Sequence, residues 1–480
     1  MAIDLNIDKK AMKSGFWYAI SNIAIRSISI ITIPIFTRLL SPSAFGIASN
    51  YSAWQNVILI LSGLCMTYSI GVAFIDFPGR IDEYISSIQT LGTIVSGILL
   101  ITAVIFSEYF GSIMKLDGYL VIFMCSYLVL SPSVAFAQIK YRYTYAYKKS
   151  VAISLINATG IVILSIALLL LLHERQYLGR IFGFSIPMMI IGAYMYYGIA
   201  KAGKVYINST YWKYALKLSL PMIPHAISMI MLDQMDRIQL GQMRNMAEVG
   251  IYSLGYSYAL LLGVFSIAIS QAWLPWLYEK YRKSEISDIH MSNQQILSFM
   301  CMITLVFIAL APEALLILGT RGYWDARWIV PPVAVATLAQ YIYSNYSSLE
   351  MYHKKTVYIA VFSVLAASLV FFLNIALIPR YGFIAAGYTT LAGYFLLMLL
   401  HNIGYRMITK IDVYNDSRTY LKLAVTMIFA AGLTAIYNYP VIRFAILGIG
   451  VILFLFIMRQ SLLDVFKGIG FEKMFSKKPY

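Results

Sequence analysis

Long apolar runs, separated by short polar segments, follow one another from residue 15 to residue 458 of this chain. About 20 consecutive apolar residues form a helix long enough to cross the ~30 Å hydrocarbon core of a bilayer. The pattern therefore predicts an all-α polytopic membrane protein with about 14 transmembrane helices. The predicted spans are roughly 15–36, 47–75, 88–107, 118–137, 151–172, 180–200, 215–240, 251–275, 296–318, 329–349, 357–378, 384–404, 420–437 and 440–458.

The composition agrees with a bilayer environment. The chain is 60% hydrophobic and 12% charged, whereas ordinary soluble domains are about 25% charged. The net charge of +16 could indicate a nucleic-acid partner, but the basic residues are dispersed among short loops, so none is expected. The three cysteines lie inside apolar runs without the spacing of metal ligands, so we expect neither a metal nor a disulfide.

Lysine and arginine favour every second loop, as the positive-inside rule requires of alternating spans. An even number of spans places both termini on the same side, which the rule identifies as the cytoplasmic side. The basic positions on that side include Lys9, Lys10, Lys13, Lys140, Lys148, Lys149, Lys201, Lys204, Lys280, Lys283, Lys354, Lys355, Arg406, Lys410, Arg418 and Lys477.

The loops are too short for chemistry outside the membrane. None exceeds about 20 residues, well below the ~50 residues of a small domain. The sequence also has no phosphate-binding glycine loop, no metal-ligand cluster and no nucleophile elbow. We therefore expect no cofactor and no enzymatic activity.

A weak internal repeat links the first and seventh spans. The first span exits through Thr37-Arg38 to Gly46-Ile47, and the seventh exits through Arg244-Asn245 to Gly250-Ile251-Tyr252-Ser253. Six spans separate the two motifs, so the halves are predicted to be parallel repeats. We divide the chain into lobes at 1–205 and 206–410, followed by two extra helices and a basic tail at 411–480.

The turn Thr37-Arg38-Leu39-Leu40-Ser41-Pro42-Ser43-Ala44-Phe45-Gly46 and its echo in the second half resemble those of a known family. The chain resembles the polysaccharide-unit (O-antigen type) flippases of the multidrug/oligosaccharidyl-lipid/polysaccharide exporter superfamily over essentially its whole length. The resemblance implies two six-helix lobes in a V-shaped arrangement, around a cavity that opens alternately to each side of a bacterial inner membrane. It implies undecaprenyl-diphosphate-linked oligosaccharide as cargo, a proton or sodium ion as coupling ion, and membrane lipids and a polysaccharide polymerase as partners.

Arg26 lies about 11 residues into the first span, which puts it ~16 Å deep at 1.5 Å per residue. A guanidinium at that depth is costly, so it should face water, a ligand or an acidic partner. Tyr18, Asn22 and Ser29 share its helix face and predict a polar cavity lining with Arg26 as the diphosphate contact. The alternative is a structural ion pair within the bundle.

The seventh span carries a second candidate group. Asp233 and Arg237 are four residues apart with the acid first, the favourable order for an intrahelical salt bridge. Asp236 then remains as a carboxylate beside the cavity, where it is a candidate ion or proton site. His225 titrates in the physiological range or packs as a neutral ring.

Two other functions fit parts of the pattern. A drug/cation antiporter of the same superfamily would favour an acidic cavity, whereas the deepest charge here is the cation Arg26. A membrane glycan polymerase or transferase would need a sizeable extramembrane loop with catalytic groups. Flippase activity is the function that we predict.

Overall fold

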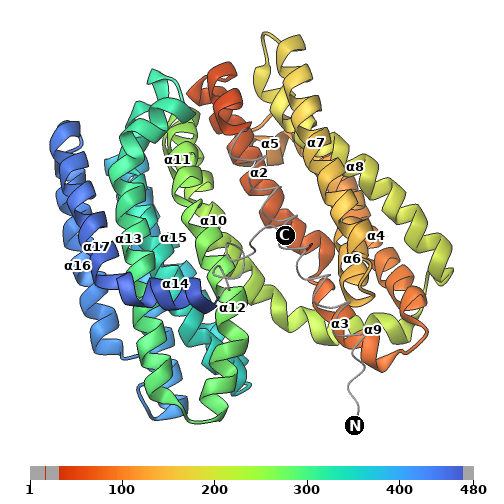
Figure 1. Ribbon diagram of the computed structural model, residues 1–480. Coiled ribbons are helices and arrows are strands. Elements are labelled where there is room, and N and C mark those ends of the chain that lie inside the picture. The colour runs from red at the N-terminus through yellow and green to blue at the C-terminus, as the bar shows by residue number, and fades with distance from the viewer. Residues whose placement is uncertain (1–16, 18–31, 469–480) are drawn as a thin grey trace, which may run out of the picture. The chain divides into compact units, whose positions relative to one another are not determined.

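The computed structural model describes Trp17 and residues 32–468, and within those residues every regular element is a helix (Figure 1). The helices of the first half are α2 (Pro42–Gly63), α3 (Thr67–Asp76), α4 (Ile81–Ile105), α5 (Ser107–Met114), α6 (Gly118–Tyr143), α7 (Tyr147–Leu171), α8 (Gln176–Gly203) and α9 (Ser209–Ser219). The remaining helices are α10 (Ile223–Met243), α11 (Met246–Ala259), α12 (Leu262–Arg282), α13 (Ile286–Leu318), α14 (Val330–Tyr352), α15 (Thr356–Thr409), α16 (Asp416–Ala435) and α17 (Pro440–Gly468), with 3₁₀ turns η1 (Leu220–Met222) and η2 (Arg321–Trp328).

The all-α polytopic class is confirmed. Ten helical stretches in the described part of the chain are long and apolar enough to cross a membrane. One of them, Thr356–Thr409, contains two predicted spans, and the predicted span at 15–36 lies almost wholly outside the described residues. The total of fourteen therefore stays a prediction.

The helix α15 is two spans joined at Gly382. A straight helix of its 54 residues would extend about 80 Å, far more than a bilayer. Gly382 has φ +59° and ψ −144°, a combination that essentially only glycine adopts. A hydrogen bond shows that the chain reverses there. The Thr389 hydroxyl donates to Oδ1 of Asn374, although fifteen residues of continuous helix would hold the two residues about 22 Å apart.

Loops that the sequence assigns to the outer side contact one another. These loops follow the predicted odd-numbered spans and lie within one compact unit of the structure. The contacts join Gln242 to the Ile113 carbonyl, Tyr177 to Asp117 (3.3 Å), Arg244 to the Pro379 carbonyl (3.4 Å), the Phe383 amide to Glu248 (3.0 Å) and Tyr323 to the Leu40 carbonyl (3.0 Å).

Loops assigned to the inner side likewise pair among themselves. In the first unit Lys140 pairs with Asp82, while Tyr211 bonds Glu83 (3.1 Å) and Tyr214 bonds Asp76 (2.6 Å). In the second unit the Tyr281 hydroxyl meets His353 (2.9 Å), and His290 meets the Asp412 carbonyl (2.7 Å). The observed pairings therefore keep the predicted alternation of odd and even loops.

The described chain packs as two compact units. The first unit comprises Met1–Leu254, Ile317–Asp325 and Ala360–Thr389, and the second comprises Gly255–Leu316, Ala326–Ile359 and Thr390–Tyr480. In the first unit α7 packs along α8, and α2 packs along α10. The lobes at 1–205 and 206–410 remain a prediction.

Candidate functional site

The predicted diphosphate contact Arg26 and its neighbours Tyr18, Asn22 and Ser29 lie outside the described residues. Their roles therefore stay predictions from the sequence. The second predicted group, on α10, is described in full and forms the centre of the candidate site.

Asp236 is a fully buried carboxylate on α10 that is bonded from two other helices. Its side chain is 0% exposed. The Tyr252 hydroxyl of α11 donates to Oδ2 at 2.5 Å, and Nδ2 of Asn374 on α15 donates to Oδ1 at 2.7 Å. Burying an isolated carboxylate is costly, and such directed hydrogen bonds offset part of that cost.

The same cluster continues from Asp236 through Asn374 to Thr389. Besides the Asp236 carboxylate, it contains the Asn374 amide oxygen and the Thr389 hydroxyl, which bond each other. Asn374 and Thr389 come together only because α15 reverses at Gly382. Carboxylate, amide and hydroxyl oxygens are the ligands that hard cations take in proteins. Here these groups form one hydrogen-bonded chain, in which the Thr389 hydroxyl donates to Asn374 and Nδ2 of Asn374 donates to Asp236.

Arg237 lies beside Asp236 and is held by several contacts. Its Nη1 donates to the main-chain carbonyl of Asp233 at 2.7 Å, and its Nε donates to the Ser253 hydroxyl at 3.2 Å. The guanidinium also lies 5.8 Å from the centre of the Tyr252 ring. The link between Arg237 and Asp233 that this contact shows is therefore to the main-chain carbonyl of Asp233.

His225 joins α10 to α15 near the other end of α10. Its Nδ1 lies 2.8 Å from the Ser363 hydroxyl, and the ring is partly buried. The contact places His225 at the interface between α10 and α15.

The two repeat motifs meet near the N-terminal ends of α2 and α11, which the sequence assigns to the outer side. A Cβ on Gly46 would lie 1.7 Å from the Met246 carbonyl oxygen, and a Cβ on Gly250 would lie 2.0 Å from that of Pro42. Each glycine thus faces the residue four positions before the other glycine. A contact in which i meets j and j meets i is that of two-fold related surfaces. The internal repeat predicted from sequence therefore has a structural counterpart.

Side chains close around this contact. The Phe45 ring of α2 packs edge-on against Tyr323, with centroids 5.8 Å apart. The Arg180 guanidinium of α8 lies 3.9 Å from the centre of the Phe45 ring and forms a cation–π contact with it. The outer ends of α2, α8 and α11 and the 317–325 segment are thus packed together within one unit.

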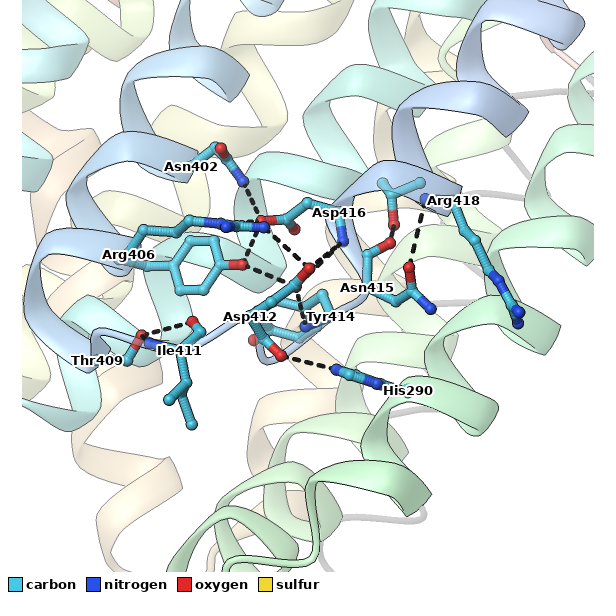
Figure 2. Close-up of polar contacts among 12 residues, drawn as sticks. His290, Asn402, Arg406, Thr409, Ile411, Asp412, Tyr414, Asn415, Asp416 and Arg418 are labelled. Atoms are coloured by element: carbon cyan, nitrogen blue, oxygen red, sulfur yellow. Dashed lines mark hydrogen bonds and ion pairs between the residues drawn. The ribbon is translucent and has the colours of Figure 1, made fainter.

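A second polar cluster lies at the inner ends of α14, α15 and α16 (Figure 2). Asp416 is 3% exposed and begins α16. Its carboxylate accepts bonds from Tyr346 (3.0 Å), Tyr405 (2.5 Å), Asn402 (2.8 Å) and Arg406 (2.6 Å). Arg406 also pairs with Asp412 at 2.9 Å. Sequence pattern does not indicate this cluster beyond an acidic residue at a helix start.

Two further buried ion pairs were not anticipated. Nδ1 of His401 lies 2.8 Å from a carboxylate oxygen of Glu350, both side chains being at most 1% exposed, and the buried Arg443 pairs with Glu313, whose side chain is 37% exposed. Each contains an ionisable residue in or beside an apolar run, which is the signal that could have identified them. Near the start of α13, the hydrogen bonds that the Lys280 ammonium donates to the carboxylates of Asp288 and Glu285 raise the pKa of Lys280 above its ordinary value.

These observations define a class: an all-helical polytopic membrane protein with two-fold related helices and a buried carboxylate, Asp236, within a predicted span. The sequence profile of the family described as polysaccharide biosynthesis protein matches residues 11–281, more than half of the 480 residues. The chain belongs to this family of polysaccharide biosynthesis proteins, as the motifs predicted.

Known relatives agree with that assignment. The Lsg locus putative protein 1 of Haemophilus influenzae is 24% identical over 335 residues, which are 66% of this chain and 80% of that protein. A structure of the lipid II flippase MurJ, in an inward closed conformation, has a TM-score of 0.72 at 16% identity and covers 93% of this chain and 99% of its own. An inward-facing multidrug resistance transporter of the MATE family has a TM-score of 0.60 at 13% identity. The match covers 81% of this chain and 98% of the transporter.

The similarity to the two solved structures shows the fold, which is the one that the sequence resemblance implied. The family assigns the chain to polysaccharide biosynthesis, and the fold is one that a flippase and a multidrug transporter share.

Proposed function

We propose that this protein moves a lipid-linked oligosaccharide unit, carried on undecaprenyl diphosphate, from the cytoplasmic to the periplasmic leaflet of a bacterial inner membrane. The family indicates a role in polysaccharide biosynthesis. The likeness to a lipid II flippase suggests a lipid-linked saccharide as the cargo. Arg26 contacts the diphosphate, because a guanidinium matches phosphate oxygens in a low-dielectric site. Tyr18, Asn22 and Ser29 complete that polar face.

The observation that carries the transport mechanism is the reciprocal contact of Gly46 and Gly250. It joins corresponding residues of two repeats, so separating them is a single symmetric movement. We infer that the outer side opens when α2 and α11 part at this contact, while the lobes at 1–205 and 206–410 rock about the centre. This is the alternating access expected of parallel repeats.

A cation at Asp236 couples to that movement. The groups that hydrogen-bond around Asp236 come from α10, α11 and both halves of α15, so any change in the packing of these helices changes the affinity for the ion. Asp233 and Arg237 lie beside the site on the same helix, and His225 lies about 16 Å away, near the other end of α10. The oxygen ligands favour sodium over a proton as the coupling ion.

The membrane potential also favours export. A diphosphate with two negative charges gains roughly 4–5 kcal/mol for each 100 mV of inside-negative potential when it moves outward. The remaining barrier is desolvation of the polar head at mid-membrane, which a water-filled cationic cavity reduces.

A reconstitution assay tests the proposal. Proteoliposomes with the purified chain receive a labelled undecaprenyl-diphosphate oligosaccharide in one leaflet, and an impermeant saccharide-modifying reagent reports its arrival in the other leaflet. We expect protein-dependent movement of this lipid and none of a cationic dye. Dye transport without lipid movement would instead identify a drug/cation antiporter of the same superfamily.

A further inference from the structure

Two cavities in the second unit join at Ser298 and Lys422, which line both. The first has a volume of about 430 Å³ and is polar, and the second has a volume of about 390 Å³ and is apolar. Both lie between α13 and α16, and α17 adds a wall to the apolar one. The three helices are neighbours in Figure 1.

The wall formed by α16 changes from basic to apolar along one stripe. Arg418 and Lys422 are one helical turn apart, and Val425, Phe429 and Leu433 continue the same face at intervals of three or four residues. On α13 the facing stripe changes in the same direction, from His290 and Gln294 through Ser298 to Cys301 and Leu305. The polar ends of both stripes belong to the predicted cytoplasmic side.

The polar cavity is built for an anion. Its lining includes Arg418 and Lys422 and contains no carboxylate among the described residues. Lys422 Nζ donates to the Gln294 carbonyl and the Ser298 hydroxyl, both at 2.7 Å, which uses two of its three N–H groups. Figure 2 shows the Arg418 side chain extending away from the carboxylates of Asp412 and Asp416, so its charge is not neutralised there.

Gln294 adds an acceptor to this cavity. Its side chain is 8% exposed, and its Nε2 donates to the Tyr414 carbonyl at 3.0 Å and to Thr419 at 3.0 Å. Its Oε1 is buried without a hydrogen-bond partner among the described residues. A buried amide oxygen without a donor is destabilising, so a headgroup hydroxyl beside the cations would stabilise it.

The apolar cavity has the length of one acyl chain. Lys422 and Leu433 are eleven residues apart, or about 16 Å along α16, which is close to half of the ~30 Å hydrocarbon core. A two-chain phospholipid in one leaflet fits that span, whereas an undecaprenyl chain is several times longer.

We propose that this site binds an anionic glycerophospholipid of the cytoplasmic leaflet. Its phosphate lies between Arg418 and Lys422, its headgroup hydroxyl donates to Gln294 Oε1, and one acyl chain fills the groove between α13, α16 and α17. The bound lipid fixes the two extra helices to α13. This inference concerns a resident lipid and is independent of the transported cargo.

Native mass spectrometry of the full-length protein tests the site, with titration of phosphatidylglycerol, phosphatidylcholine and undecaprenyl phosphate. We expect phosphatidylglycerol to bind tighter than phosphatidylcholine. The Arg418→Gln change removes an exposed charge, so folding should be retained while affinity for phosphatidylglycerol falls about fivefold, and the double variant with Lys422→Gln should lose more than tenfold. Lys354→Gln with Lys355→Gln removes two exposed charges on the same side and should leave affinity unchanged.

A groove variant gives a second, independent test. Gly450 lines the apolar cavity, and a Cβ there would meet no atom within 4 Å, which also holds for Gly448 on the same helix. Gly450→Phe should therefore exclude the acyl chain and lower phosphatidylglycerol affinity, while Gly448→Phe should not. Equal binding of both phospholipids, or affinity unchanged in Arg418→Gln and Gly450→Phe, would overturn the site. Preferential binding of undecaprenyl phosphate would contradict the assignment of a glycerophospholipid to this site.

Discussion

Gly46 of α2 and Gly250 of α11 lie against each other's helices, each facing the main-chain carbonyl that precedes the other by four residues. The contact leaves no room for even one methyl group, since a Cβ would approach those oxygens to 1.7 and 2.0 Å. It brings together corresponding positions of the two sequence repeats at the outer ends of their helices. Because backbone atoms form the contact on both sides, no side-chain rotation can relieve a clash there, and the two helices must move apart.

Replacing either glycine by alanine should open the outer side. A clash of this kind costs about 1–3 kcal/mol, which shifts a two-state equilibrium roughly 5- to 150-fold. In a variant lacking Cys65, Cys125 and Cys301, a cysteine at the buried Ser49 should then react faster with an impermeant maleimide. Gly63→Ala is the matched control, because its Cβ would meet nothing within 4 Å. Unchanged labelling in Gly46→Ala and Gly250→Ala would rule out a gate at this contact.

Asp236→Asn should abolish stabilisation by sodium. A site that binds only the folded state raises the free energy of unfolding by about 2.7 kcal/mol at a concentration of 100 Kd. The melting temperature of the wild-type protein should therefore be higher in sodium chloride than in choline chloride, and the difference should vanish in Asp236→Asn. Glu279→Gln, an exposed carboxylate paired with Lys283, should keep it. A sodium effect that persists in Asp236→Asn contradicts the assignment.

Gly382→Ala should destabilise the reversal in α15. A residue with a side chain is strained at φ +59° with ψ −144°, at a cost of about 1–3 kcal/mol, and its Cβ would also lie 2.4 Å from Oε2 of Glu248. Gly432→Ala in α16 has open space around its Cβ, so the same substitution should be neutral or stabilising by up to about 1 kcal/mol. Thermal unfolding in detergent measures both, and equal melting temperatures would argue against a strained turn.

Asp416→Asn should loosen the inner ends of α15 and α16. The substitution removes the charge that four donors share, at a cost of about 2–3 kcal/mol. Glu285→Gln breaks a partly exposed pair with Lys280 and should cost less than about 1 kcal/mol. Hydrogen exchange of residues 410–420 reports the difference, and equal exchange in the two variants would show that the Asp416 cluster does not hold the helices together.

Sequence pattern predicted the fold well because apolar length alone decides which segments cross a bilayer. The positions of Gly46 and Gly250 in the repeat also predicted a relationship that the structure contains. Pattern could not identify Asn374 and Thr389 as partners of Asp236, because they lie on separate spans whose approach depends on the reversal at Gly382. The Asp416 cluster was missed for the same reason, since its donors come from several helices and each is ordinary in its own segment.

The most direct test of the proposed mechanism is leaflet-to-leaflet transfer of labelled undecaprenyl-diphosphate oligosaccharide by wild-type, Arg26→Ala and Arg26→Lys proteins in proteoliposomes. If Arg26 holds the diphosphate, Arg26→Ala should insert normally but lose transfer, and Arg26→Lys should recover part of it because charge is kept without the guanidinium fork. Transfer by Arg26→Ala at the wild-type rate would contradict the account.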